Sequence, residues 1–391
     1  MGIFAMNVVS FAMPGEAHFN PTAYGLEGPA DLATWFTTFI LFDGKMRGLF
    51  TFLFGASLLL VVQRAEAKGE PPLSVHARRM AWLLLLGAAH FVLLWDGDIL
   101  VDYALVGLIA FFFCDKPPRT LLALAGVFIL IQAVFTGAIS DTFISASADA
   151  RAPGASAAAI ETWQSMSANF SPPAPATLAA DLALYRGTYF GLVVHRAGAV
   201  VSDASGAFLQ GGFETLGTML GGMWALKSGF LTGAWSCGAY ARFALIGVGL
   251  GAGVYAAMAA HLYARGFEVS LLYAYAIGAA TLLRPLMVLG WVAAIILTTR
   301  RGGTLVDRIA AVGRTAFTNY LATSIVATTI FYGYGGGLYG RLSRWELYPL
   351  MFAVWMAMLS WSKPWLGRYR YGPFEWLWRS LSRGERQPMR R

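Results

Sequence analysis

The stretch RRMAWLLLLGAAHFVLLWDGDILVDYALVGLIAFFF, from Arg78 to Phe113, decides the fold of this chain. It contains two apolar runs that are separated by a short acidic turn from Asp96 to Ile99. Lys and Arg favour the cytoplasmic end of a membrane span, so the basic pair at Arg78 places the start of the first run there. The stretch therefore predicts a helical hairpin that crosses a membrane outward and returns.

Ionisable side chains lie inside this predicted hairpin. At 1.5 Å per residue, His90 and Asp102 both lie roughly 7 to 10 Å inside the outer boundary of the membrane. Asp98 and Asp102 are spaced to share one face of the returning helix. Because ionisable groups are costly in a bilayer, such a cluster is a candidate catalytic site. We expect His90 to contact Asp102 or Tyr103, either as a general base or transient acyl carrier, or as a packing histidine.

Composition places the whole chain in a membrane. Of its 391 residues, 57% are hydrophobic and 13% are charged, and the mean hydropathy is +0.57. This leaves too little polar surface for a soluble globular protein and predicts an all-α polytopic membrane helix bundle. The net charge of +8 comes from basic residues in short loops beside apolar runs, which indicates membrane topology and not nucleic-acid binding. Two cysteines are too few for a disulfide framework or a Cys/His metal site, so no metal is expected.

About ten transmembrane helices are expected within a single integral membrane domain, residues 1–391. Of the 29 Lys and Arg residues, twenty fall in the predicted inner segments and six in the outer ones, so both termini are expected in the cytoplasm. Residues 31–42 are too short to span and are expected to form an interfacial or re-entrant helix. The predicted spans are 2–13 (the outer part of a helix whose start is missing), 46–62, the two runs of the hairpin, 121–139, 207–226, 243–262, 271–298, 315–332 and 347–361.

Two long polar segments flank these spans. Residues 140–206 are rich in Ala, Ser and Pro and are expected to form a long extracytoplasmic loop, with short amphipathic helices near 160–166 and 178–194. Residues 363–391 form a tail that alternates aromatic and basic side chains. This alternation predicts an amphipathic helix on the anionic inner leaflet.

Further charged residues are candidates for substrate binding. Asp96, Lys45 and Arg47 fall at the same outer level, either as a charged floor that orients a substrate or as a solvated, snorkelling rim. Glu214 and Arg284 lie within predicted spans. Arg284 either binds an anionic group, such as a phosphate or carboxylate, or pairs with Glu214 structurally.

Small residues in the predicted spans indicate close helix packing. Gly217, Gly221 and Gly222 lie in span 207–226, and span 243–262 has glycines at alternate positions. Small side chains let helix backbones approach closely in a membrane. We therefore interpret both glycine series as packing positions.

Four strings resemble the YeiB-like family of bacterial inner-membrane proteins. The resemblance covers nearly the whole chain and implies a multi-pass protein of the bacterial inner (plasma) membrane, in a family with no firm activity. The strings, in order, are FDGKMRGLFTFLFGAS from Phe42, HFVLLWDGDILVDYALVG from His90, GRTAFTNYL from Gly313 and GPFEWLWR from Gly372.

This family is similar to a wider set of transmembrane acyltransferases, including heparan-alpha-glucosaminide N-acetyltransferase-like proteins. Those enzymes use cytosolic acetyl-CoA to acylate an acceptor on the other side of the membrane. In them an Asn near the outer end of the first helix and a His shortly after it form the reacting pair, a pattern that matches Asn7 and His18 here. The Asp and Arg-Gly pair that normally precede this helix are absent from this chain. The YeiB-like pattern also favours an aromatic residue at the position of His18.

The same resemblance suggests where an acyl-CoA donor would bind. Asn319 and Tyr320 lie about one turn into the ninth predicted span. They are expected to hydrogen-bond the pantetheine arm, or else to join helices. The basic groups of the tail would meet the phosphates of CoA, although membrane anchoring is the favoured role.

Three functions remain open from the sequence. The first is an O- or N-acyltransferase that moves an acetyl or other acyl group from cytosolic acyl-CoA to an extracytoplasmic small molecule, glycan or lipid. The second is a small-solute or lipid transporter with a path through Asp102 and Glu214. The third is a structural subunit of an envelope complex, and membrane lipids and a homodimer partner are compatible with all three. The sequence has no P-loop and no dinucleotide-binding glycine fingerprint, which argues against ATP-driven pumping and nicotinamide chemistry.

Overall fold

The protein is described here by a computed structural model that covers the backbone of residues 1–391 and every side chain except those of Ala204, Ala207 and Leu209. The described residues form helices and no strand, which confirms the predicted all-α class. The helices are α1 (Gly2–Ala12), η1 (Gly15–His18), α2 (Pro29–Leu41), α3 (Lys45–Glu66), α4 (Pro72–Leu93), α5 (Leu100–Ala110), η2 (Phe111–Phe113), α6 (Pro118–Arg151), α7 (Ala157–Ser167), α8 (Pro175–Tyr185), α9 (Tyr189–Lys227), α10 (Cys237–Ala244), η3 (Leu245–Leu250), α11 (Gly251–Ala264), α12 (Val269–Tyr273), η4 (Ala274–Ala279), α13 (Ala280–Thr299), α14 (Thr304–Arg314), α15 (Ala316–Phe331), α16 (Leu347–Arg368) and α17 (Pro373–Arg383).

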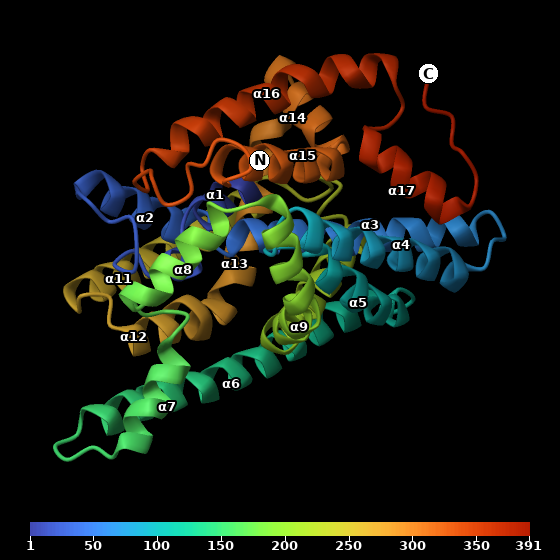
Figure 1. The fold of residues 1–391 in the computed structure, drawn as a ribbon. Helices are drawn as coiled ribbons and strands as arrows, with labels where there is room; N and C mark the ends of the chain where they lie inside the picture. The colour runs from blue at the N-terminus through green and yellow to red at the C-terminus, as the bar shows by residue number, and fades with distance from the viewer.

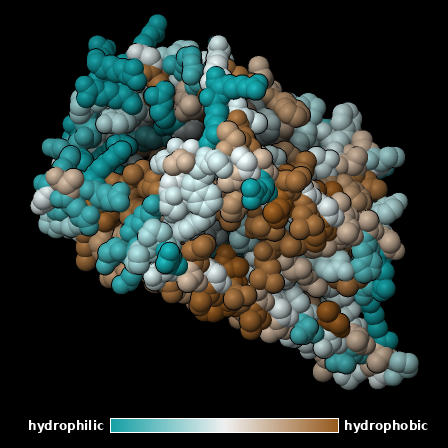
Figure 2. All heavy atoms as spheres, turned by 180° about the vertical axis from the view of Figure 1, so that it is seen from behind, coloured by the Kyte–Doolittle hydropathy of each residue, from teal (hydrophilic) through white to brown (hydrophobic). Residues whose placement is uncertain are grey.

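Four helical stretches are long and apolar enough to cross a membrane. They are Pro29–Glu66, Pro118–Arg151, Cys237–Ala264 and Val269–Thr299. Apolar side chains gather across the middle of one face of the molecule, with hydrophilic side chains toward its two ends (Figure 2). In Figure 1, α2, α11 and α12 lie toward one end, whereas α17 and the C-terminus lie toward the other. This arrangement identifies the chain as a membrane protein.

The predicted hairpin is formed by α4 and α5, which pack against each other. The turn between them ends at Asp98, whose carboxylate accepts the backbone N–H groups of Leu100 and Val101 at 2.8 and 3.0 Å. These two N–H groups have no partner inside the helix, so Asp98 satisfies the start of α5. Asp98 is therefore a helix-capping residue.

The segment 140–206 is mostly helical, where the sequence predicted a long loop. Helix α6 continues to Arg151, and α9 is already helical at Tyr189, with α7 and α8 between them. Figure 1 shows α6 as one long helix with α7 folded against its far end. Alanine has the highest helix propensity, so this Ala-rich segment extends the helices beyond the apolar spans. The break at residues 186–188 divides the second expected amphipathic helix into α8 and the start of α9.

Small residues in α9 allow close helix contacts, as predicted. A Cβ atom on Gly217 would lie 2.9 Å from the carbonyl oxygen of Ala125 in α6. A Cβ on Gly222 would collide with the carbonyl oxygen of Phe52 in α3. Helix α9 is therefore held tightly between α3 and α6.

The tail folds back onto the bundle. The carboxylate of Glu375 in α17 accepts the backbone N–H groups of Phe317 and Thr318 at 2.7 and 3.1 Å, and thus caps the start of α15. The indole N–H of Trp378 donates to the carbonyl oxygen of Arg79 at 3.0 Å. The apolar face of the predicted amphipathic helix is thus packed against α4 and α15.

Candidate functional site

A polar cavity of about 540 Å³ lies between α1, the start of α3, the turn of the hairpin, α8, α9 and the π-helix η4. It has the largest volume of the cavities described here. Its ionisable lining residues are His18, Asp43, Arg47, Asp96, Asp181, Asp203, Glu214 and Arg284.

Asn7 and His18, the pair suggested by the resemblance, both line this polar cavity. Asn7 and Ser10 are three residues apart, so they lie on the same face of α1. Nδ1 of His18 lies 2.9 Å from the hydroxyl oxygen of Ser10. Nε2 of His18 lies 3.5 Å from Oδ1 of Asp43. The structure thus forms a serine, histidine and carboxylate row on the cavity wall.

Neither Ser10 nor Asp43 was a candidate from the sequence. Ser10 is an ordinary polar residue in an apolar helix, and nothing in its spacing distinguished it. Asp43 had a usable signal, since it interrupts an apolar stretch inside the FDGK string. An imidazole with a carboxylate on one nitrogen and a hydroxyl on the other is arranged to accept a proton.

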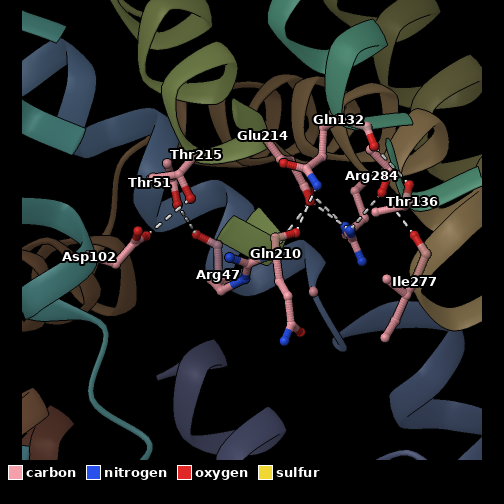
Figure 3. A network of polar contacts seen from close by, with 12 residues as sticks. Arg47, Thr51, Asp102, Gln132, Thr136, Gln210, Glu214, Thr215, Ile277 and Arg284 are labelled. Carbon is pink, nitrogen blue, oxygen red and sulfur yellow. Dashed lines mark hydrogen bonds and ion pairs between the residues drawn. The ribbon is translucent and has the colours of Figure 1, made fainter. Parts of the chain in front are cut away.

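Glu214 is the centre of a second charged group on the cavity wall (Figure 3). Its two carboxylate oxygens accept hydrogen bonds from Nε and Nη2 of Arg284, each at 2.7 Å. These bonds confirm the structural pairing of Glu214 with Arg284, one of the two roles expected for Arg284 from the sequence. Arg284 also donates to the carbonyl oxygen of Ala276 in η4 at 3.3 Å. Arg47 lies 3.7 Å from Glu214, and its side chain is 29% exposed. Arg47 is therefore the more accessible guanidinium of the group.

His90 does not contact Asp102, and that prediction was wrong. Its Nδ1 lies 2.8 Å from Oδ1 of Asp98, and its Nε2 lies 2.9 Å from the hydroxyl oxygen of Ser324 in α15. The expected contact requires Asp98 to be helical, but α5 begins only at Leu100. Asp98 therefore turns back over the last turn of α4. His90 is 3% exposed and joins α4, the turn and α15.

Asp102 faces α9 instead. Its carboxylate accepts the hydroxyl of Thr215 at 3.2 Å, as Figure 3 shows. Among the described residues, its second oxygen has no hydrogen-bond partner. The polar cavity lining contains Asp96 but neither Asp98 nor Asp102.

Lys45 also lies away from the cavity. Its ammonium group donates to the carbonyl oxygen of Phe39 and lies 3.2 Å from the ring centroid of Tyr255 in α11. The side chain is fully buried, so Lys45 is not part of the expected charged floor. Arg47 and Asp96 do line the cavity, as that expectation required.

A tyrosine pair forms part of the cavity lining that the sequence did not indicate. The rings of Tyr185 and Tyr339 stack with centroids 4.4 Å apart. Tyr185 donates to Asp96 at 2.7 Å, and Tyr339 donates to Asp181 at 3.0 Å. Burial raises the pKa of Asp181 above its ordinary value, and the hydrogen bond from Tyr339 offsets part of that rise. The two carboxylates are therefore held in place by phenol hydroxyls.

A second cavity, of about 120 Å³ and mainly apolar, lies between α1, the end of α14 and α15. Asn319 and Tyr320 line it, where the sequence placed a donor-binding site. The amide of Asn319 donates to Thr315 and accepts the indole N–H of Trp361, so this residue also joins helices. We call this space the apolar cavity.

The polar and apolar cavities share two lining residues, Asn7 and Trp95. Trp95 stacks on Phe11 of α1 with ring centroids 4.0 Å apart. Asn7 thus lies between an apolar space on one side and the His18 row on the other. A reacting group could reach Asn7 from either cavity.

Comparison with known proteins finds relatives of unknown function. Residues 225–385 match the family described as "Protein of unknown function (DUF418)". The uncharacterized protein YeiB of Escherichia coli is 31% identical over 398 residues, covering 98% of this chain and 93% of YeiB. The uncharacterized protein YxaH of Bacillus subtilis is 30% identical over 409 residues, covering 99% of this chain and 92% of YxaH. No solved structure matches this chain.

Proposed function

This chain belongs to the family of uncharacterised proteins that includes YeiB and YxaH, and from that premise we propose that it is a transmembrane acyltransferase. The donor is an acyl-CoA from the cytoplasm, with acetyl-CoA as the simplest case. The acceptor is a hydroxyl or amine of an extracytoplasmic small molecule, glycan or lipid.

One observation carries this proposal: the apolar and polar cavities meet at Asn7 and Trp95. A thioester needs an uncharged channel that shields it from water, and a polar acceptor needs hydrogen-bonding groups. Each cavity supplies one of these environments. Transfer between them requires no movement of either substrate across the membrane.

The proposal includes a topology of ten spans, in the bacterial inner membrane, with both termini in the cytoplasm. The distribution of basic residues supports it. It places the polar cavity toward the outside, and the α14 side of the apolar cavity toward the cytoplasm. The ten helical segments are α1, α3, α4, α5 with η2, α6, α9, α10 to α11, α12 to α13, α15 and α16.

His18 acts as the general base in this proposal. As the acceptor attacks the thioester carbonyl, its proton passes to the hydroxyl of Ser10 while the Ser10 proton passes to Nδ1 of His18, and Asp43 at Nε2 stabilises the resulting imidazolium. A new carbon–oxygen or carbon–nitrogen bond forms and the carbon–sulfur bond breaks. The proton then passes from His18 to the departing thiolate, and Asn7 is placed to hold the carbonyl oxygen.

His90 and Asp98 take a positioning role. They hold the turn of the hairpin against α15, which carries Asn319 and Tyr320 along the apolar cavity. Loss of His90 would therefore disturb the donor-binding wall without removing a reacting group.

The test uses purified protein in lipid nanodiscs with acetyl-labelled acetyl-CoA and a lipid and glycan extract as acceptor source. Wild-type protein is expected to transfer label, and His18→Ala to transfer at least about 100-fold less, as for loss of a general base. His195→Ala, an exposed histidine in α9, is the matched control and is expected to behave as wild type. Equal rates in wild type and His18→Ala would overturn the proposal.

Transport is the second candidate because the two cavities also line up as a path. Uptake or efflux of a solute that is lost in Glu214→Gln, in protein that shows no acetyl transfer, would favour it.

A further inference from the structure

A third cavity, of about 330 Å³, lies where α3 ends, α4 begins and α17 packs across them. We call it the arginine pocket. Two carboxylates, Glu70 and Glu385, also line it, so the arginines are in excess. The arginines that line it are Arg64, Arg78, Arg79, Arg379 and Arg383.

Folded contacts hold some of the arginines of the pocket in place, although four of the five, Arg64, Arg78, Arg379 and Arg383, are exposed. The guanidinium of Arg79 lies 4.2 Å from the ring centroid of Trp378, whose indole N–H binds the carbonyl oxygen of the same arginine. Arg379 stacks on Tyr371 at 4.6 Å. Among the described residues, Arg383 is the one arginine of the pocket in an ion pair, with Glu70 at 3.7 Å. Like charges are thus held together without enough acids to balance them, which favours a bound anion.

The arginine pocket adjoins an apolar pocket. Val61 and Arg79 line both spaces. This connecting pocket, of about 100 Å³, is lined mainly by apolar side chains such as Phe54 and Leu83. Phe50 lines both the connecting pocket and the apolar cavity next to Asn7. Four neighbouring cavities therefore follow one another from the arginines to the His18 row.

One face of α3 runs along this whole series. Phe50, Phe54, Ser57 and Val61 are three or four residues apart, so they share that face. Arg47 lies on the polar cavity at one end, and Arg64 lies on the arginine pocket at the other. At 1.5 Å per residue, Phe50 and Arg64 are about 21 Å apart along the helix. Between its two ends the series is lined mainly by apolar side chains, with Arg79 at the end next to the arginine pocket.

We propose that the arginine pocket binds the phosphate groups of the acyl-CoA donor, with the pantetheine arm lying along α3 and the thioester reaching Asn7. Phosphate oxygens are favoured partners of clustered guanidinium groups. An extended pantetheine arm is uncharged, narrow and of about the length that the α3 face spans. This inference rests on the proposed acyl transfer, and names the residues that would select its donor.

The first arm of the test uses wild-type protein in nanodiscs of neutral lipid and needs no variant. Binding of CoA, 3′-dephospho-CoA and pantetheine is measured by calorimetry at fixed salt. The affinity is expected to fall in that order, by about tenfold or more when all phosphates are removed. Equal affinity for CoA and pantetheine would overturn the proposal.

The second arm uses Arg379→Gln together with Arg383→Gln, on the solvent side of α17. This variant is expected to weaken CoA binding by about tenfold or more and to leave pantetheine binding unchanged. Arg370→Gln, an exposed arginine just before α17, is the matched control and is expected to bind CoA as wild type. Unchanged CoA binding in the double variant would contradict the proposal.

A lipid headgroup carries the same phosphate chemistry, so a third arm separates the two sources. CoA binding is repeated in the presence of a short-chain phosphatidylglycerol. Binding of the lipid that depends on Arg379 and Arg383, in protein that does not bind CoA, would assign the pocket to lipid and overturn the proposal.

The two proposals fail in different ways. Phosphate-dependent CoA binding without acetyl transfer would leave the pocket assigned and remove the transferase function. Acetyl transfer with the same KM for acetyl-CoA in wild type and double variant would keep the function and remove the pocket. Absence of both binding and transfer would remove both.

Discussion

Glu214 and Arg284 join α9 to α13 through two parallel hydrogen bonds of 2.7 Å. Both side chains are largely buried, and Arg47 approaches the same carboxylate at 3.7 Å. Removal of one partner from a buried pair leaves an uncompensated charge, whereas removal of both does not. Single and double substitutions of this pair therefore test how much the buried ion pair contributes to the stability of the fold.

The first prediction concerns this pair. Arg284→Met is expected to lower the free energy of unfolding by about 3 to 5 kcal/mol, because Glu214 then stays buried with a weaker partner. The double variant with Glu214→Gln is expected to lose less than the sum of the two single variants. Denaturant unfolding of detergent-solubilised protein measures both. Strict additivity would show that the two side chains act independently.

The second prediction separates the two histidines. His90→Ala removes one hydrogen-bond partner from the buried carboxylate of Asp98 and one from Ser324, and is expected to cost about 1 to 3 kcal/mol of stability. His18→Ala lies on a cavity wall and is expected to leave the unfolding transition close to that of wild type while it removes acetyl transfer. Thermal unfolding and transfer are measured on the same preparations. A His90→Ala protein with wild-type stability would contradict the positioning role.

The third prediction concerns pH and the ion cluster of Arg151, Arg265 and Glu268. Arg151 and Arg265 lie 2.7 and 3.0 Å from the carboxylate of Glu268. The hydrogen bond from Arg151 is the main cause that lowers the pKa of Glu268 below its ordinary value of 4.5. A lowered pKa means that the cluster stabilises the fold fully above about pH 4.5, and that this contribution is lost as the pH falls below it.

The measurement is thermal unfolding of wild type and Glu268→Gln from pH 7 to pH 3.5. At pH 7 the variant is expected to unfold at a lower temperature, and the difference is expected to shrink below about pH 4.5. Glu161→Gln, an exposed glutamate in α7, serves as the control. A difference that stays constant over the whole range would contradict the prediction.

The fourth prediction uses two glycines of one helical stretch. A Cβ on Gly247 would lie 2.6 Å from Cα of Gly290 in α13, whereas a Cβ on Gly253 would meet open space. Gly247→Ala is therefore expected to lower the free energy of unfolding by about 1 to 3 kcal/mol. Gly253→Ala is expected to be neutral or to stabilise by up to about 1 kcal/mol, since alanine is the better helix former. Equal effects at both positions would show that the contact with α13 is not tight.

The hairpin and the all-α fold were predictable because both depend on hydrophobic pattern. Long apolar runs must bury their backbone polar groups in helices, whatever the side chains do. Glu214 and Arg284 were also predictable as partners, because a charge inside a span needs a nearby opposite charge. These predictions rest on the composition of many residues, so they stay correct even when the predicted ends of a helix are wrong by a few residues.

The contacts of individual side chains in the site depend on where each helix begins, to within a few residues. Several predicted contacts were therefore wrong. Moving the start of α5 past Asp98 was enough to redirect the contact of His90 from Asp102. Lys45 turned toward Tyr255, and no local pattern distinguishes that direction from the cavity. Ser10 and Asp43 gain their importance from distant contacts with His18, which spacing does not encode.

The cap that Glu375 places on α15 also bears on the order in which the protein is made. Helix α15 leaves the ribosome before α16, and Glu375 follows both. The wall of the apolar cavity formed by α15 therefore stays uncapped at its start while α16 is being inserted. During that interval the backbone N–H groups of Phe317 and Thr318 lack the carboxylate that caps them in the folded protein, and the cap forms only once α17 has been made.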